Sequence, residues 1–138
     1  ALVLANTCFQ AVQAIGYPEC DIILSQTVTY LATSPKSNAS YLAISEAQQL
    51  VKQTGNLPVP LHLRNAPTSL MKDLGYGTEY RYAHDENNAY AAGENYFPEE
   101  LRDTQYYQPS NRGLEKKLQE KLHYLQSLDK QSPKQRYK

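Results

Sequence analysis

The chain has 138 residues, within the size range of one compact domain, and its 14 basic side chains balance its 14 acidic ones. No stretch approaches the ~20 apolar residues of a membrane-spanning helix, and no charged start followed by an apolar run indicates a secretion signal. Residues 1–111 hold six basic and eleven acidic side chains, a net charge of −5, whereas residues 112–138 hold eight and three, a net charge of +5. Because the chain opens inside the apolar run Leu2-Val3-Leu4 without a cap, we expect a fragment of a longer protein.

Apolar residues at helical spacing predict three helices in residues 1–56. The first covers residues 1–15 and stops at Gly16, the second covers residues 18–33, and the third covers residues 37–54. Their short connections predict antiparallel packing, so we expect an all-α fold that starts with a three-helix core. Cys8 and Cys20 lie on apolar faces without companions for a zinc site, and we expect buried, reduced thiols in a cytosolic protein.

Residues 57–77 begin with three prolines within ten residues, which exclude a helix there. The apolar residues between the prolines alternate with a period of two: Leu57, Val59, Leu61 and Leu63. We therefore expect an extended belt with one buried edge, laid across the helical core. A short helix should follow over residues 66–74, with Asn65 as its N-cap and Gly75 as its stop.

Residues 78–109 belong to a tyrosine-rich stretch without sustained periodicity, and we expect an irregular segment that clasps the helices through its rings. The last helix is expected over residues 110–130 with Ser110 as its cap. Its apolar stripe is made of leucines three or four residues apart: Leu114, Leu118, Leu122, Leu125 and Leu128. The polar, basic tail over residues 131–138 is expected to fray.

Motifs of common enzymes are missing from the sequence. It contains no G-x-x-x-x-G-K-[S/T] phosphate loop, no G-x-S-x-G elbow and no H-E-x-x-H pair. His84-Asp85 could orient an imidazole, but no nucleophile accompanies it, so a structural histidine is favoured. Glu99-Glu100 after Pro98 resembles the first turn of a short helix more than a catalytic carboxylate pair. We expect no enzymatic activity, no cofactor and no metal site in this chain.

Arg64 lies between two prolines, and two interpretations are open. A rigidly held arginine could act as a finger in trans or as a phosphate clamp. Alternatively, Arg64 pairs with a carboxylate and satisfies carbonyls that the proline-rich belt cannot pair itself, which is the favoured interpretation.

The tyrosines admit a nucleic-acid interpretation, because rings next to basic residues, as in Tyr80-Arg81-Tyr82, and the pair Tyr106-Tyr107 could stack on bases. The surrounding segment is acidic and would repel a phosphate backbone, so structural or interface roles are favoured. Candidate DNA contacts are better sought on the last helix and tail: Lys116, Lys117, Lys121, Lys130, Lys134 and Arg136.

Three blocks of the sequence resemble a known family. Tyr30 to Ala39 is similar to "YLA-x-x-PKSNA", residues 57–77 are similar to "(L/V)P-x-HLRNAPT-x-LMK-x-LGYG", and Tyr96 to Leu101 is similar to "YLP-(D/E)-E-L". These are motifs of the replication-associated recombination protein A family, AAA+ ATPases related to clamp loaders and to the Werner helicase-interacting protein. The residues that carry the resemblance are Pro35, Lys36, Ser37, Asn38, Pro58, Pro60, His62, Leu63, Arg64, Asn65, Ala66, Pro67, Gly75, Tyr76, Gly77, Tyr82, His84 and Asp85.

The resemblance implies that this chain is the C-terminal part of such an ATPase. It implies an all-helical domain similar to the clamp-loader C-terminal oligomerisation domain, which assembles the ATPase as a homotetramer. ATP and Mg²⁺ would bind in the preceding part, and the full-length protein would be a DNA-stimulated ATPase. The implied partners are identical subunits, single-stranded DNA-binding protein and DNA at stalled replication forks, with no membrane, in the bacterial cytoplasm and nucleoid. A DNA-binding module built on the basic last helix is the alternative.

Overall fold

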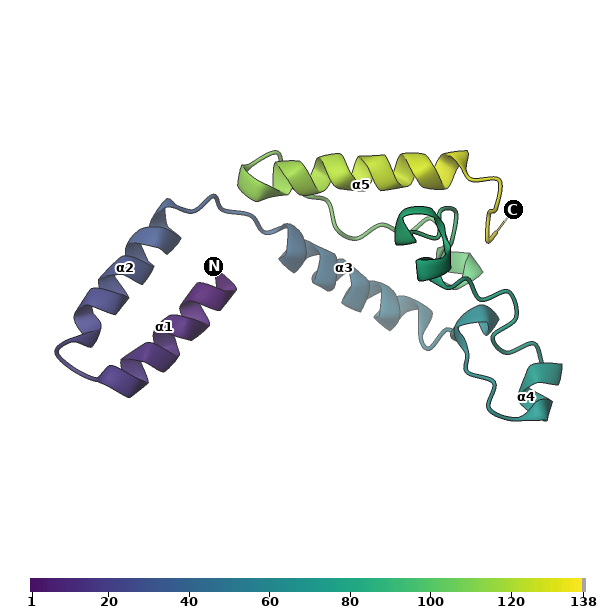
Figure 1. The fold of residues 1–138 in the computed structure, drawn as a ribbon, viewed down its shortest axis with the longest axis horizontal. Coiled ribbons are helices and arrows are strands. Elements are labelled where there is room, and N and C mark those ends of the chain that lie inside the picture. The colour runs from purple at the N-terminus through teal and green to yellow at the C-terminus, as the bar shows by residue number, and fades with distance from the viewer. Residues whose placement is uncertain (138) are drawn as a thin grey trace. The chain divides into compact units, whose positions relative to one another are not determined.

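The computed structural model describes residues 1–137 (Figure 1); Lys138, the last residue of the expected tail, lies outside them. The described residues form five α-helices and four short 3₁₀ turns and contain no strand, which confirms the all-α prediction. None of the helices in this part of the chain is long and apolar enough to cross a membrane. The chain divides into two units, residues 1–36 and residues 37–138.

The first unit is a helical hairpin. Helix α1 (Leu2–Ile15) ends where Gly16, at φ +75°, donates its N–H to Val12, and helix α2 (Cys20–Thr33) packs against it. Cys8 and Cys20 are buried in this hairpin as free thiols, as predicted. Lys36 donates to the carbonyl of Leu31 at the end of α2, so the lysine of the P-K-S-N segment caps that helix.

The second unit begins with helix α3 (Ala39–Thr54), whose first N–H is accepted by the Ser37 hydroxyl at 3.2 Å. Helix α3 ends at Gly55, which has φ +69°. Since α3 belongs to a different unit from α1 and α2, the antiparallel core of residues 1–56 stays a prediction.

The belt buries different residues from those predicted. A 3₁₀ turn, η1 (Leu61–Leu63), interrupts the expected extended run and turns the His62 side chain inward, where it is 6% exposed. Val59 and Leu61 are instead about half exposed, at 56% and 48%. The prediction of a buried edge was therefore wrong at Val59 and Leu61, whereas Leu57 and Leu63 are half-buried. The turn interrupts the alternation on which the prediction depended.

Helix α4 (Ser69–Asp73) starts later than predicted. Its N-cap is Thr68, whose hydroxyl accepts the Met71 N–H at 3.3 Å, and Asn65 is not the cap. Gly75, at φ +80°, lies just past the end of α4, as the predicted stop requires.

The tyrosine-rich segment is irregular, as predicted, and contains three 3₁₀ turns. They are η2 (Ala83–Asp85), η3 (Asn87–Ala89) and η4 (Glu99–Leu101), and η4 follows Pro98 as its sequence indicated. Rings of this segment do reach helix α5 (Gly113–Gln131): Tyr90 and Tyr107 bind its acidic side chains.

Two expectations about the C-terminal end were wrong. Helix α5 begins at Gly113, and Ser110 does not cap it; the Ser110 hydroxyl instead donates to Glu115 at 2.6 Å. The tail is also not frayed in residues 132–137, since Arg136 and Tyr137 bind the tyrosine-rich segment through ion pairs and hydrogen bonds. Carboxylates and carbonyls distant in sequence supply these partners, so composition alone did not indicate them.

Candidate functional site

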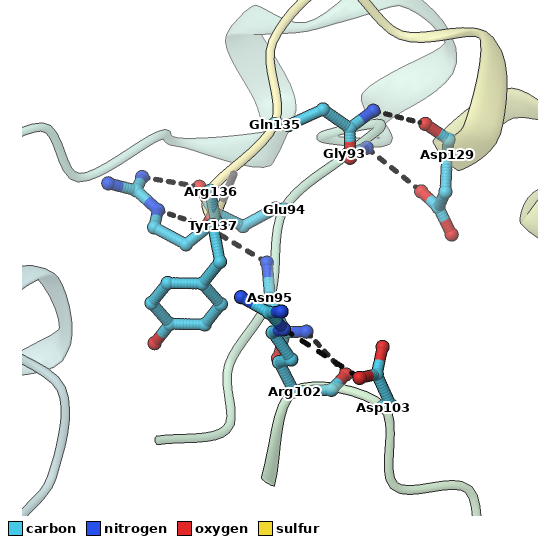
Figure 2. Close-up of a pocket in the computed structure, with 9 residues that line it drawn as sticks. All are labelled: Gly93, Glu94, Asn95, Arg102, Asp103, Asp129, Gln135, Arg136 and Tyr137. Carbon is cyan, nitrogen blue, oxygen red and sulfur yellow. Dashed lines mark hydrogen bonds and ion pairs between the residues drawn. The ribbon is translucent and has the colours of Figure 1, made fainter. Parts of the chain in front are cut away.

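The C-terminal tail meets the tyrosine-rich segment at one buried carboxylate, that of Glu94, whose side chain is 2% exposed. Arg136 binds both of its oxygens, with Nε 2.6 Å from Oε1 and Nη2 2.7 Å from Oε2 (Figure 2). The Asn95 N–H donates to Oε1 at 3.0 Å, and His62 Nε2 lies 3.7 Å from the same oxygen. A two-pronged arginine–carboxylate contact of this kind is both strong and geometrically specific.

Main-chain contacts extend the docking of the tail on either side of this ion pair. Arg136 Nη2 also donates to the Glu79 carbonyl at 2.8 Å. Three further bonds join the tail to the segment: Arg136 N–H to Gly93 O (3.0 Å), Tyr137 O–H to Phe97 O (2.6 Å) and Ser132 O–H to Ala92 O (2.8 Å). The tail is thus held by carbonyl acceptors and one carboxylate.

The Glu94–Arg136 pair is ionised at neutral pH. Burial alone would raise the pKa of Glu94, but the hydrogen bonds from Arg136 and from the Asn95 N–H lower that pKa below its ordinary value. The same bond to Glu94 raises the pKa of Arg136. His62 Nε2 is 3.1 Å from the carbonyl of Asn95, and because a carbonyl only accepts, this nitrogen carries the proton.

Asp129, near the end of α5, fixes the same segment from the helix side. Its carboxylate accepts from the Tyr90 hydroxyl at 2.8 and 2.9 Å and from the Gly93 N–H at 3.0 Å. Burial and the bond to Asp129 raise the pKa of Tyr90 to about 12, so the phenol keeps its proton and remains a donor.

Glu115, in the first turn of α5, gathers donors from two nearby residues. It accepts from the Ser110 N–H at 2.8 Å and hydroxyl at 2.6 Å and from the Tyr107 hydroxyl at 3.1 Å. Hydrogen bonds, those from Ser110 first and that from Tyr107 among the others, lower the pKa of Glu115 to about 2. This carboxylate ties the start of α5 to the end of the tyrosine-rich segment.

Replacing Glu115 by Gln should therefore give a pH-dependent loss of stability. The folded-state pKa of about 2 lies below the ordinary 4.5, so the contribution of this carboxylate is complete above about pH 4.5 and is lost as the pH falls through the folded-state pKa. Urea unfolding should show a lower midpoint for the variant at pH 7 and a shrinking difference toward pH 2. Glu120→Gln, at an exposed position of the same helix, is the control and should match the wild type throughout; a constant difference at all pH values for Glu115→Gln would contradict the assignment.

A polar pocket of about 390 Å³ lies beside the Glu94 cluster (Figure 2). Its lining carries charges of both signs and two neutral amides: Gly93, Glu94, Asn95, Arg102, Asp103, Asp129, Gln135, Arg136 and Tyr137. Among these residues no nucleophile lies beside a general base, and residues 1–137 hold no cluster of three metal-ligating side chains. The charges and amides of this lining suit recognition of a charged or polar peptide group.

The family-motif residues of the belt have structural contacts. Arg64 donates from Nε to the Val59 carbonyl at 2.6 Å, and its guanidinium lies 5.0 Å from the centre of the Tyr76 ring. The prediction that Arg64 donates to a carbonyl of the belt is thus confirmed. The predicted ion pair with a carboxylate is not formed in residues 1–137. Gly77 closes the belt by donating to the Leu61 carbonyl at 2.8 Å.

His84 and Asp85 lie together in turn η2 without forming a catalytic pair. The His84 ring contacts the Tyr82 ring at 5.0 Å, a structural contact. The imidazole that does approach a carboxylate is that of His62, beside Glu94. His62 and Glu94 are 32 positions apart in the sequence, so no local pattern predicted this pairing.

Of the candidate DNA contacts, Lys116, Lys117 and Lys121 are exposed on α5. Arg136 was a wrong candidate, because its side chain is 11% exposed and is bound by Glu94 and Glu79. Lys134 is 67% exposed and lies 3.6 Å from Glu86. The basic excess of the C-terminal end is thus partly neutralised within the fold.

Sequence reasoning missed Glu94, Gly93, Asp129 and Arg136 as one cluster. Gly93, Glu94 and Arg136 lie in stretches without periodicity, Asp129 lies on the polar side of the last helix, and contacts such as Glu94–Arg136 join residues 42 positions apart. The one available signal was the complementary charge of the acidic segment and the basic tail.

Residues 1–137 thus form an all-helical domain in which a charged cluster joins the tail to the tyrosine-rich segment. The model of the family described as "MgsA AAA+ ATPase C terminal" matches residues 1–126, most of the chain. The chain belongs to this family of C-terminal AAA+ ATPase domains, which confirms the resemblance stated from the motifs.

Relatives in bacteria and eukaryotes agree with this membership. The chain is 54% identical over 138 residues to replication-associated recombination protein A of Haemophilus influenzae and 50% identical over 138 residues to that of Escherichia coli K12. In both cases the match covers 100% of this chain and 31% of the relative. ATPase WRNIP1 of Dictyostelium discoideum is 37% identical over 108 residues, which are 78% of this chain and 12% of the relative. The chain thus spans about a third of the length of its bacterial relatives.

Proposed function

We propose that this chain is the oligomerisation domain of a longer AAA+ ATPase and holds identical subunits together as a tetramer. The observation that carries the proposal is an apolar stripe on α3 without cover. Tyr41, Ile44 and Val51 are spaced for one side of the helix and are 70%, 55% and 59% exposed. Packing against other copies would remove this surface from water.

The helical hairpin of the first unit supports the same proposal. Leu2, Val3 and Phe9 on α1 are each more than 60% exposed, and Ile22 on α2 is exposed as well. Large contiguous apolar patches on a soluble domain usually mark an interface. On α5 the first leucine of the predicted stripe, Leu114, is 72% exposed, whereas Leu122, Leu125 and Leu128 are partly covered.

In the full-length protein we assign ATP and Mg²⁺ binding, and hydrolysis, to the part outside this chain, because the chain carries no phosphate-binding loop. The proposed setting is the stalled replication fork in the bacterial cytoplasm and nucleoid. There the assembled ATPase would meet DNA and single-stranded DNA-binding protein, and this domain would fix the spacing of the ATPase parts. The names of the bacterial relatives, which refer to replication-associated recombination, support this setting.

Light scattering of an α3 variant tests the proposal. Ile44→Glu places a charge in the exposed stripe. It should lower the mass of the oligomer by at least one subunit, because an unpaired charge at an apolar interface is strongly unfavourable. Gln49→Glu, at an exposed position away from the stripe on the same helix, should keep the wild-type mass. Equal masses for wild type and Ile44→Glu would reject α3 as the interface.

A DNA-binding module is the second candidate function. It is favoured by Lys116, Lys117 and Lys121, which are exposed on α5 and form no ion pair with a described carboxylate. Fluorescence anisotropy with forked and single-stranded DNA should then show binding that weakens with salt, and neutralising the three lysines should lower the salt slope by about 2 to 3. Lys52→Gln and Lys72→Gln, on helices α3 and α4, serve as controls. Absence of binding at low salt would remove this candidate.

A further inference from the structure

The C-terminal tail is bound in the way that a separate peptide ligand would be bound. Residues 132–137 form no helix or strand, and their contacts run to carboxylates and carbonyls of residues 79–97 and to the end of α5. Between the anchoring residues, Pro133, Lys134 and Gln135 are exposed. The tail also lies beyond residues 1–126, the part matched by the family model.

The surface under the tail is held in place by groups that do not belong to the tail. The Glu94 carboxylate is fixed by the Asn95 N–H at 3.0 Å and by His62 at 3.7 Å. The Ala92 carbonyl is held by Arg81, whose Nη1 donates to it at 2.8 Å while Nε binds Glu86 at 2.8 Å. These supports give a socket with one carboxylate placed for a guanidinium (Figure 2).

The acceptors of the socket match an arginine followed by a tyrosine. Glu94 and the Glu79 carbonyl take the guanidinium of Arg136, and the Phe97 carbonyl takes the hydroxyl of Tyr137 at 2.6 Å. Gly93, whose carbonyl accepts the Arg136 N–H at 3.0 Å, lets the backbone of the tail approach closely. A lysine cannot reproduce the two-pronged contact with Glu94, since its ammonium group lacks the two parallel N–H donors of a guanidinium.

We propose that this socket is a recognition site for a peptide carrying Arg-Tyr, and that the chain's own tail fills it in cis. The tail then competes with an Arg-Tyr segment of a partner protein, and release of the tail opens the site. This inference goes beyond the assembly role and does not depend on it.

Peptide binding to full-length variants of this chain tests the proposal. The probe is a fluorescent peptide of residues 132–138, and the receptor is the chain with Arg136→Ala, whose own tail no longer fills the socket. Anisotropy should show saturable binding at least about tenfold tighter than to the wild-type chain, where the tethered tail competes at high effective concentration. Two controls should abolish binding: an Arg136→Ala peptide, and a receptor that also carries Glu94→Gln. Equal binding of both peptides, or no binding to the folded variant, would overturn the proposal.

A milder variant covers the case in which Arg136→Ala does not fold. Tyr137→Phe removes only the hydroxyl that donates to the Phe97 carbonyl, and a lysine-specific protease should then cut after Lys134 about fivefold faster. Tyr124→Phe, at an exposed position on α5, should be cut at the wild-type rate. An unchanged rate for Tyr137→Phe would show that the hydroxyl does not hold the tail and would overturn the proposal.

Discussion

Gly93→Ala should lower the free energy of unfolding of the second unit by about 2–4 kcal/mol, because it combines an unfavourable backbone conformation with a collision. Gly93 has φ +77°, and a Cβ at this position would lie 1.9 Å from the carbonyl oxygen of Lys134 and 3.0 Å from the Ser132 side chain. The tail must move away, and its contacts with Glu94 and Phe97 are lost with it. Denaturant unfolding followed by circular dichroism gives the free energy.

Gly55→Ala is the matched control for this prediction. Gly55 has φ +69°, but no atom lies within 4 Å of its added Cβ. This variant meets only the cost of a backbone conformation that is almost confined to glycine, about 1–3 kcal/mol, without a collision. If both variants lost the same free energy, the close approach of the tail at Gly93 would be contradicted.

Arg136→Met should cost about 3–5 kcal/mol, the range for removing one partner of a buried ion pair. Glu94 would remain 2% exposed as a charge without its guanidinium, and the Asn95 N–H and His62 would be its remaining neighbours. Thermal unfolding at pH 7 measures the loss. Arg112→Met, which changes an exposed arginine, should stay within about 0.5 kcal/mol of the wild type.

A double-mutant cycle separates this ion pair from the general packing of the tail. With Glu94→Gln the buried charge is gone, so adding Arg136→Met should cost clearly less than it does in the wild type. A coupling free energy near zero between the two positions would mean that Arg136 is not held by Glu94.

The sequence predicted helices better than it predicted contacts. Apolar spacing placed the helices over residues 2–15, 20–33 and 39–54 to within two residues at each start, because local periodicity depends only on nearby residues. The predicted buried edge of the belt was wrong at Val59 and Leu61, because the 3₁₀ turn η1 buries His62 instead. No local sequence pattern predicts such a 3₁₀ turn between prolines.

The candidate site was the part that the sequence could not supply. In the sequence, nothing distinguishes Glu94 from the other acidic residues of its segment, or Arg136 from the other basic residues of the tail. Their importance comes from mutual burial, which depends on Asp129 and Tyr90 fixing the segment against α5. The family motifs marked the belt instead, where Arg64 and Gly77 hold the local backbone.

The lysines of α5 illustrate a related limit. A net charge of +5 over residues 112–138 suggests one basic surface. In the fold, however, Arg136 and Lys134 face Glu94, Glu79 and Glu86, so two of those charges are balanced by residues of the acidic half. Among the described residues, the exposed Arg112, Lys116, Lys117, Lys121 and Lys130 remain for a phosphate backbone. The loss of Arg136 and Lys134 from this surface weakens the DNA-binding alternative relative to assembly.

Sedimentation equilibrium of the wild-type chain at tens of micromolar is the most direct test of the assembly role. Burial of the exposed side of α3 and of the hairpin between copies predicts a mass that is a multiple of the 15.6 kDa chain, four times that mass for a tetramer. A single species of 15.6 kDa across the concentration range would contradict the account.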